Sequence, residues 1–298
     1  MRPAPFRYIR PRNTAEALAA LAEHGAAARP LAGGQSLVPL MNLRMSRPDV
    51  LVDLNRCRDL AFIERRGNDL VYGAMTRQIE AQTSALTLRH CPLIAKALAL
   101  AGPVAIRNRG TLGGTLAHAD RSAELPAVAA ALDAVFVVDG VEGRREVPAR
   151  QFFITDLVTD VGPGEMLCEV RFPIAEDDAS AIFLEVGTRQ RDMALAGLAA
   201  QLAMNADRTC RDAHLALIGI EAAPLRLREI EDRLRGRRVD GGLIAALAQH
   251  LFEQVDPIGD LHADAGYRRH VAKTLLARAL ASWSLVDTLW RMPERRQW

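Results

Sequence analysis

The stretch RNRGTLGGTLAHAD, residues 107–120, places two adjacent glycines, Gly113 and Gly114, between the hydroxyl residues Thr111 and Thr115. Glycine has no Cβ and adopts a positive φ at little cost, so its backbone can approach a ligand closely. Successive backbone N–H groups that point into one concavity bind anionic oxygens. The stretch therefore predicts a loop that binds phosphate, with a plain turn as the alternative.

A second glycine pair, Gly33 and Gly34, lies earlier in AGGQSL, residues 32–37, with Ser36 as its hydroxyl residue. The short apolar stretch before it predicts a strand that runs into a tight loop. Two such loops that meet in space can hold two phosphates, and a branched side chain at Gly33 or Gly114 is then expected to block the ligand. Neither pair fits G-x-G-x-x-G or the P-loop pattern, so a Rossmann or P-loop nucleotide site has no support.

Size and charge limit the class of protein. The 298 residues predict about two domains, because single hydrophobic cores stop growing near ~250 residues. Hydrophobic residues make up 49% of the chain and charged residues 25%, so intrinsic disorder is excluded. A formal net charge of +2 gives no strong field that would attract nucleic acid, and no nucleic-acid partner is expected.

The four cysteines, Cys57, Cys91, Cys168 and Cys210, are far apart in the sequence. None forms the closely spaced pair that iron–sulfur clusters and structural zinc sites use, so any such centre is expected on a partner. The first twelve residues lack the apolar core of a secretory signal, and uncharged runs such as 193–206 are too short to cross a bilayer. We expect a cytoplasmic chain without a membrane span.

Hydrophobic periodicity and capping residues predict alternating helices and strands. Helices are expected over residues 13–24, 91–100, 122–132, 225–234, 241–254 and 267–283. Strands are expected over residues 50–54, 69–72, 134–138, 145–147 and 167–172, with a hairpin around Gly140 and Gly143. Asn13 and Asp240 are the candidate N-caps of the helices that follow them.

The polar, acidic connector 173–180 is the predicted domain boundary. It separates an N-terminal domain over residues 1–176 from a C-terminal domain over residues 177–285, and residues 286–298 form a tail. The tail residues Trp290 and Trp298 fit either a partner contact or a frayed end. In the C-terminal domain, the alanines and leucines of 193–204 favour a helix, but the break after them and the apolar stretch 214–220 favour a β-hairpin, which is the structure we predict.

The glycine motifs carry a resemblance to a known family. AGGQSL followed by PLM at 39–41, and RGTLGG at 109–114 followed by AHAD at 117–120, are similar in order and spacing to the FAD-binding medium subunits of molybdenum hydroxylases. This is the carbon monoxide dehydrogenase and xanthine dehydrogenase family. The resemblance continues through EVGTRQRD at 185–192 and the C-terminal Asp256-Pro257 and YRRH at 267–270, so it covers nearly the whole chain.

The resemblance implies an α+β fold. The N-terminal part is then a vanillyl-alcohol-oxidase-like, PCMH-type FAD-binding domain of two α+β subdomains, and the C-terminal part is a small α+β domain with a three-stranded antiparallel sheet. FAD lies in the cleft between these parts in that family. Gln35 takes a position that is histidine in some relatives, and its amide has no nucleophile for a bond to the flavin, so FAD is expected to be noncovalent.

Matched residue by residue, the resemblance implies three groups of FAD contacts. Two loops would hold the pyrophosphate and ribitol: Ala32, Gly33, Gly34, Gln35, Ser36, Leu37, Thr111, Gly113, Gly114 and Thr115. Asp120 and Glu124 match positions near the adenosine half, and Arg189 and Asp192 match the approach to the flavin ring. Thr115 stands where many relatives have asparagine and Arg121 where most have proline, so the loop after Asp120 is expected to differ.

The resemblance also implies partners. A large subunit with a molybdenum cofactor oxidises the substrate, a small subunit relays the electrons through [2Fe–2S] clusters, and FAD on this chain passes them to NAD, a quinone, a cytochrome or oxygen. The expected assembly is a dimer of such heterotrimers. This chain then needs no catalytic acid or base and no metal ligand. The alternatives are a stand-alone flavin oxidase or dehydrogenase and a noncatalytic nucleotide-binding assembly protein.

Overall fold

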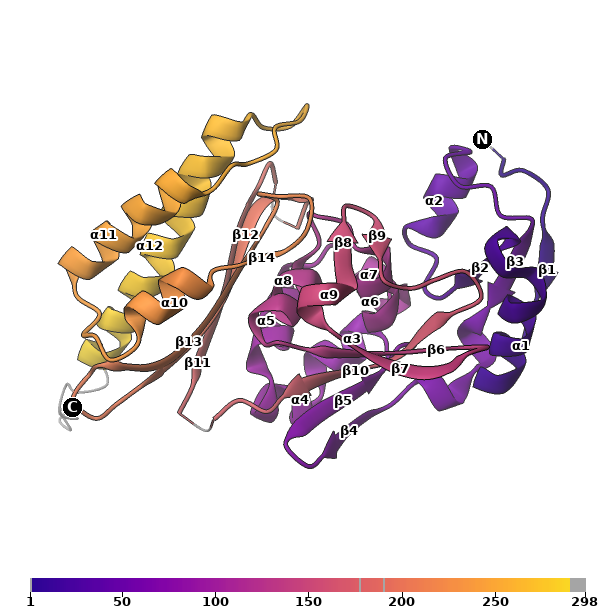
Figure 1. Cartoon of the computed structure of the whole chain (residues 1–298), viewed down its shortest axis with the longest axis horizontal. Helices are drawn as coiled ribbons and strands as arrows, with labels where there is room; N and C mark the ends of the chain where they lie inside the picture. The colour runs from indigo at the N-terminus through magenta and orange to yellow at the C-terminus, as the bar shows by residue number, and fades with distance from the viewer. Residues whose placement is uncertain (1, 177, 190, 290–298) are drawn as a thin grey trace, which may run out of the picture.

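The computed structural model describes residues 2–176, 178–189 and 191–289. Figure 1 shows three units along the long axis of the molecule: a small N-terminal unit, a central unit around a five-stranded sheet, and a C-terminal unit in which helices cover one face of a sheet. The α+β class is therefore confirmed. Residues 290–298 of the expected tail, with Trp290 and Trp298, lie outside the described residues.

The first unit is a parallel sheet in the order β1-β3-β2 with helices around it. Its elements are β1 (Arg7–Ile9), α1 (Thr14–His24), the 3-10 helix η1 (Gly25–Ala27), β2 (Ala28–Leu31), α2 (Leu37–Asn42), β3 (Val50–Asp53) and the 3-10 helices η2 (Leu54–Arg56) and η3 (Arg58–Leu60). The Asn13 side chain accepts a hydrogen bond from the Glu16 N–H, which confirms the predicted cap. Ala17 and Leu21, four residues apart on α1, share the buried face of that helix.

The second unit is built on an antiparallel sheet in the order β4-β5-β10-β6-β7. Its strands are β4 (Ile63–Arg66), β5 (Asp69–Gly73), β6 (Val135–Gly140), β7 (Gly143–Pro148) and β10 (Met166–Pro173), with a small hairpin of β8 (Phe153–Thr155) and β9 (Val158–Thr159). Its helices are α3 (Gln78–Thr83), α4 (Ala85–His90), α5 (Pro92–Leu100), α6 (Val104–Arg109), α7 (Leu112–His118), α8 (Glu124–Ala131) and α9 (Ala149–Phe152). The predicted β6–β7 hairpin and the helix that starts at Pro92 are confirmed.

The third unit is an antiparallel sheet in the order β11-β12-β13-β14. Its elements are β11 (Ser180–Gly187), β12 (Ala194–Met204), β13 (Cys210–Ile218), β14 (Leu225–Arg226), α10 (Arg228–Leu234), α11 (Gly241–Gln254) and α12 (Ala265–Leu289). The antiparallel sheet expected here is confirmed with three long strands, to which β14 adds a short fourth strand, and Asp240 caps α11 as predicted. The helix predicted from residue 225 begins only at Arg228, because Leu225 and Arg226 pair with β13 instead.

The strand β12 is buried on both faces. Leu198 and Ala200 belong to the core beneath α10, α11 and α12, whereas Ala199 belongs to the core of the second unit on the other side of the sheet (Figure 1). A strand that is covered on both sides is apolar at nearly every position, here all but Gln201, and lacks the period of two that marks a half-buried strand. This explains the ambiguity of residues 193–204 in the sequence, where the predicted hairpin with β13 is confirmed.

The second and third units meet along α8, which packs against β12 and β13. Arg226 of β14 donates to the carbonyl oxygens of Ala130, at 2.7 Å, and Ala131 at the end of this helix. Carbonyl groups in the last turn of a helix lack the usual donor four residues further on, and the negative end of the helix dipole attracts a cation, so a guanidinium is a suitable donor for them. The interface therefore holds polar as well as apolar contacts. In the part of the chain that the structure describes, no helix combines the length and the apolar character needed to span a membrane.

Candidate functional site

The first glycine loop, residues 32–36, follows β2 and precedes α2. Gly34 has a φ of +73°, in the left-handed region that glycine adopts without strain. Among the hydrogen bonds of the described residues, none starts from the N–H groups of Gly33, Gly34, Gln35 or Ser36. The Gln35 side chain binds back to the Gly33 carbonyl oxygen at 3.1 Å. This loop therefore offers a series of backbone donors, as the sequence predicts.

The second glycine pair does not follow a strand. Gly113 and Gly114 lie in α7, and both of their N–H groups are already bonded, that of Gly113 to the Ala74 carbonyl oxygen and that of Gly114 to Thr111 Oγ1, each at 3.0 Å. The predicted series of free backbone donors is therefore wrong for this loop. Thr111 is the N-cap of α7, and the hydroxyl groups of Thr111 and Thr115 are the polar groups that this loop contributes.

The two loops contact each other through their glycines. A Cβ on Gly33 would meet the carbonyl oxygen of Arg109 and lie 2.8 Å from Gly110 Cα, and a Cβ on Gly114 would lie 3.4 Å from Ala32 Cβ. The prediction that the two distant loops meet in space is confirmed. Gly33 is also needed for the contact between the loops, a role that the sequence-based interpretation does not include, and its contact with a phosphate stays a prediction.

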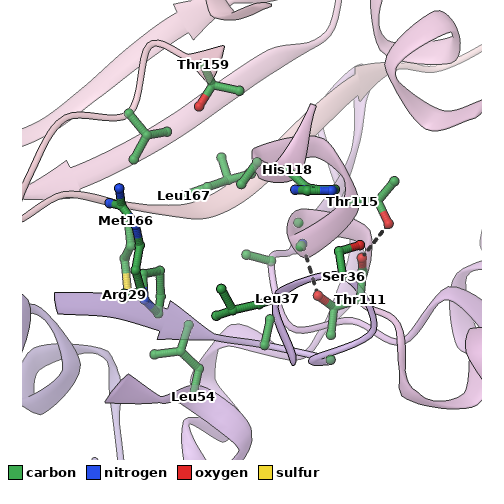
Figure 2. Close-up of a pocket in the computed structure, with 18 of the residues that line it drawn as sticks. Arg29, Ser36, Leu37, Leu54, Thr111, Thr115, His118, Thr159, Met166 and Leu167 are labelled. Carbon is green, nitrogen blue, oxygen red and sulfur yellow. Dashed lines mark hydrogen bonds between the residues drawn. The ribbon is translucent and has the colours of Figure 1, made fainter. Parts of the chain in front are cut away.

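Both loops line one cavity of about 590 Å³, and every loop residue assigned to the pyrophosphate and ribitol is on its wall. The opposite wall includes Leu54 and Met166, and Arg29 reaches in from β2. Figure 2 shows Arg29 and Met166 across an open centre from Ser36 and Thr111. Apolar walls with a few converging polar groups are typical of cofactor sites.

A second cavity, of about 270 Å³, lies between residues of the second and third units. Leu157 lines both cavities, so the two are neighbours. Asp120 and Asp192 share the wall of this second cavity, although the resemblance assigns them to opposite ends of the cofactor. Arg189 is on the wall of neither cavity. The contacts of these residues with FAD stay predictions.

Glu124 is buried in the first turn of α8, with 8% of its surface exposed, and lines neither cavity. Burial, followed by the charges of Glu185 and Asp120, raises the pKa of Glu124 to about 8, although Arg107 opposes the shift. Burial also raises the pKa of Glu185 on β11 to about 7. The structure therefore makes Glu124 a buried carboxyl between two units, away from the cavity walls where an adenosine contact would be expected.

Three polar residues outside any motif support the loops: Asn55, Arg77 and Gln78. The Gln78 side chain donates to Thr115 Oγ1 at 2.7 Å, and its backbone N–H donates to the Gly110 carbonyl oxygen at 2.9 Å. Arg77 and Asn55 link the two loops through their side chains. Their partners are distant in the sequence, so no local pattern marks them as functional.

Comparison with known proteins identifies the family. A family model described as the FAD binding domain in molybdopterin dehydrogenase matches residues 4–175, and one described as the CO dehydrogenase flavoprotein C-terminal domain matches residues 181–283. The chain belongs to this family of FAD-binding subunits. Its fold is accordingly the PCMH-type FAD-binding fold followed by the small C-terminal domain, and its cofactor is FAD.

Whole-chain relatives support the assignment. The 6-hydroxypseudooxynicotine dehydrogenase complex subunit alpha of Paenarthrobacter nicotinovorans is 37% identical over 94% of this chain and 95% of its own length. The carbon monoxide dehydrogenase medium chain of Hydrogenophaga pseudoflava is 34% identical over 95% of this chain and 99% of its own length. A solved chain of quinoline 2-oxidoreductase from Pseudomonas putida 86 matches with a TM-score of 0.91 at 34% identity, covering 96% of this chain and 99% of that chain. The FAD subunit identity therefore rests on both sequence and fold.

The first cavity fits FAD. The series of N–H donors at residues 33–36 suits an anionic pyrophosphate, and the hydroxyl groups of Ser36, Thr111 and Thr115 suit the polar linker. The apolar residues Leu54 and Met166 suit an aromatic ring.

Asp260 connects the second and third units at the edge of the second cavity. Its carboxylate accepts hydrogen bonds from Arg121 and, at 2.6 Å, from the buried Arg268. Burial raises the pKa of the Asp260 carboxyl. The N–H groups of His262 and Ala263 and the Arg268 guanidinium outweigh this effect and hold that pKa well below its usual range. Arg121 therefore connects the second unit to this carboxylate of the third unit.

We expect Asp260→Asn to lower the free energy of unfolding by about 2 kcal/mol near pH 7, because it weakens a partly buried ion pair. A carboxyl whose folded pKa is depressed stabilises the fold above its unfolded pKa and loses this contribution as the pH falls towards its folded pKa. The deficit of the variant should therefore shrink below about pH 4. Urea unfolding at pH 7 and pH 3.5 measures it. Asp256→Asn, at a fully exposed position nearby, is the control, and a deficit equal at both pH values would contradict the assignment.

Proposed function

We propose that the chain is the electron-transfer subunit of a molybdenum hydroxylase, which holds FAD between a small subunit with [2Fe–2S] clusters and an external electron acceptor. A large subunit with a molybdenum cofactor would oxidise the substrate, and a dimer of heterotrimers is the expected assembly. Membership of the family supports this role, as do relatives that are named medium chains or complex subunits.

One observation carries the proposal: the free N–H groups of residues 33–36 line the same cavity as the hydroxyl groups of Thr111 and Thr115. The N–H groups would bind the pyrophosphate, and the hydroxyl groups would orient the linker. The apolar wall would exclude water from the ring that it covers. By the family resemblance, Asp120 would lie near the adenosine half and Asp192 near the flavin ring, and both residues line the second cavity. Bound FAD itself supplies the redox chemistry, accepting two electrons and passing them on.

The proposal predicts which electron donors can reduce the bound FAD. The purified full chain, loaded with FAD, should show the visible absorption bands of flavin, and those bands should bleach when a reduced [2Fe–2S] partner subunit is added without oxygen. Organic substrates alone should not bleach them. Stopped-flow absorbance measures both reactions. Rapid bleaching by an organic substrate in the absence of partners would instead support a stand-alone flavin dehydrogenase, and a chain that never acquires flavin bands would support a noncatalytic role.

A further inference from the structure

The side chains of Asn55 and Arg77 form a continuous chain of hydrogen bonds between the two glycine loops. Arg77 Nη1 donates to the Arg109 carbonyl oxygen of the second loop at 2.5 Å, and Arg77 Nη2 donates to Asn55 Oδ1 at 2.7 Å. Asn55 Nδ2 in turn donates to the Ala32 carbonyl oxygen of the first loop at 3.0 Å. The two residues therefore join the Ala32 carbonyl group, just before Gly33, to the Arg109 carbonyl group at the end of α6, just before Gly110.

Asn55 is anchored in the first unit and Arg77 in the second. The Asn55 N–H donates to Asp53 Oδ1 at 3.0 Å, and Asp53 is buried at the end of β3. The backbone of Arg77 pairs with that of Thr111, and the adjacent Gln78 N–H binds the second loop. Because each backbone is fixed to a different unit, the bridge between the units is made by the two side chains.

The chemistry of this bridge is specific to its residue types. A guanidinium is a planar fork that donates to two separate acceptors at once, whereas a lysine ammonium is a single point charge. The amide of Asn55 presents an acceptor to Arg77 and a donor to Ala32, and this arrangement also fixes which amide atom is oxygen. Neither Asn55 nor Arg77 lines the cavity, so neither is placed to bind FAD itself.

We propose that Arg77 and Asn55 are positioning residues for FAD, a loop clamp that fixes the spacing between the first and second glycine loops. This spacing sets where the N–H donors of residues 33–36 stand relative to Thr111 and Thr115 across the cavity. A site preorganised in this way loses less free energy on ordering when its ligand binds. The inference rests on the proposed function, because it requires FAD to lie between these loops.

The test is a titration of FAD into the full-length apoprotein, followed by fluorescence. We expect Arg77→Met and Asn55→Ala each to weaken FAD binding about tenfold or more, as the loss of a hydrogen bond to a charged group predicts. Arg77→Lys should bind FAD as weakly as Arg77→Met, because lysine keeps the charge but not the fork. Arg65→Met is the matched control: this exposed arginine on β4 donates to the nearby Gly67 carbonyl oxygen and to no other group among the described residues, so wild-type affinity is expected.

The double variant distinguishes a shared bridge from two separate effects. Since both residues belong to one chain of hydrogen bonds, Arg77→Met with Asn55→Ala should weaken binding little more than either change alone. Losses that multiply would overturn the clamp. Wild-type affinity for FAD in both Arg77→Lys and Asn55→Ala would also overturn the clamp. Arg77 would then act on FAD directly through its charge. If wild-type protein binds FAD and both single variants bind it equally well, only the clamp fails; if wild-type protein binds no FAD, the proposed function fails with it.

Discussion

Replacing Gly33 by alanine is expected to weaken FAD binding about 100-fold, or about 2.7 kcal/mol, while the chain still folds. The added Cβ would meet the Arg109 carbonyl oxygen and lie 2.8 Å from Gly110 Cα. Both atoms are backbone, so no side-chain rotation relieves the contact, and the loops must move apart. The N–H donors of the first loop then no longer face Thr111 and Thr115. Titration of apoprotein with FAD measures the loss.

Alanine at two other glycines is expected to weaken FAD binding less than Gly33→Ala. A Cβ on Gly114 would lie 2.6 Å from Thr111 Oγ1, a side-chain atom that can rotate away at the expense of the α7 cap, so Gly114→Ala should lose less affinity than Gly33→Ala. Gly241→Ala is the control, because a Cβ there meets nothing within 4 Å. Gly33→Ala protein that binds FAD as tightly as Gly241→Ala protein would show that the contact between the loops does not shape the site.

The sequence reveals the two loops because they carry compact local patterns. Paired glycines beside hydroxyl residues can be recognised in the sequence alone. So can the helix caps Asn13 and Asp240, because each accepts a hydrogen bond from an N–H group three residues further on. The resemblance adds the architecture of both domains. These predictions succeed because each depends on residues that are neighbours in the chain.

The environment of the second glycine pair could not be predicted from the sequence. Glycine is a poor helix former, which disfavours a helix across Gly113 and Gly114. Tertiary contact overrides this preference: a Cβ on Gly113 would lie 2.6 Å from Ala74 Cα, so only glycine allows α7 to pack there. The roles of Asn55 and Arg77 are hidden for a related reason, because hydrogen bonds between distant segments leave no periodic signal.

Replacing Glu124 by glutamine should make the protein more stable above pH 8, by on the order of 3 kcal/mol. The carboxyl is buried beside Glu185 and Asp120, and its pKa is raised to about 8. In the unfolded chain its pKa is near the ordinary value of 4.5, so between pH 4.5 and pH 8 the folded protein holds a proton that the unfolded chain releases. The unfolded state then binds fewer protons, and the wild-type free energy of unfolding falls as the pH rises through this window.

Glutamine imitates the protonated carboxyl and does not titrate, so the Glu124→Gln variant should lose most of this decline. Urea unfolding at intervals from pH 5 to pH 9 should therefore give curves for variant and wild type that diverge with rising pH. The residual slope of the variant should reflect Glu185, whose pKa is raised to about 7 by burial. Glu142→Gln, at an exposed position in the β6–β7 turn, should follow the wild-type curve. Parallel curves for Glu124→Gln and wild type would mean that Glu124 is ionised in the folded protein, paired with a cation such as Arg107, and that the interface between the second and third units carries a charge there.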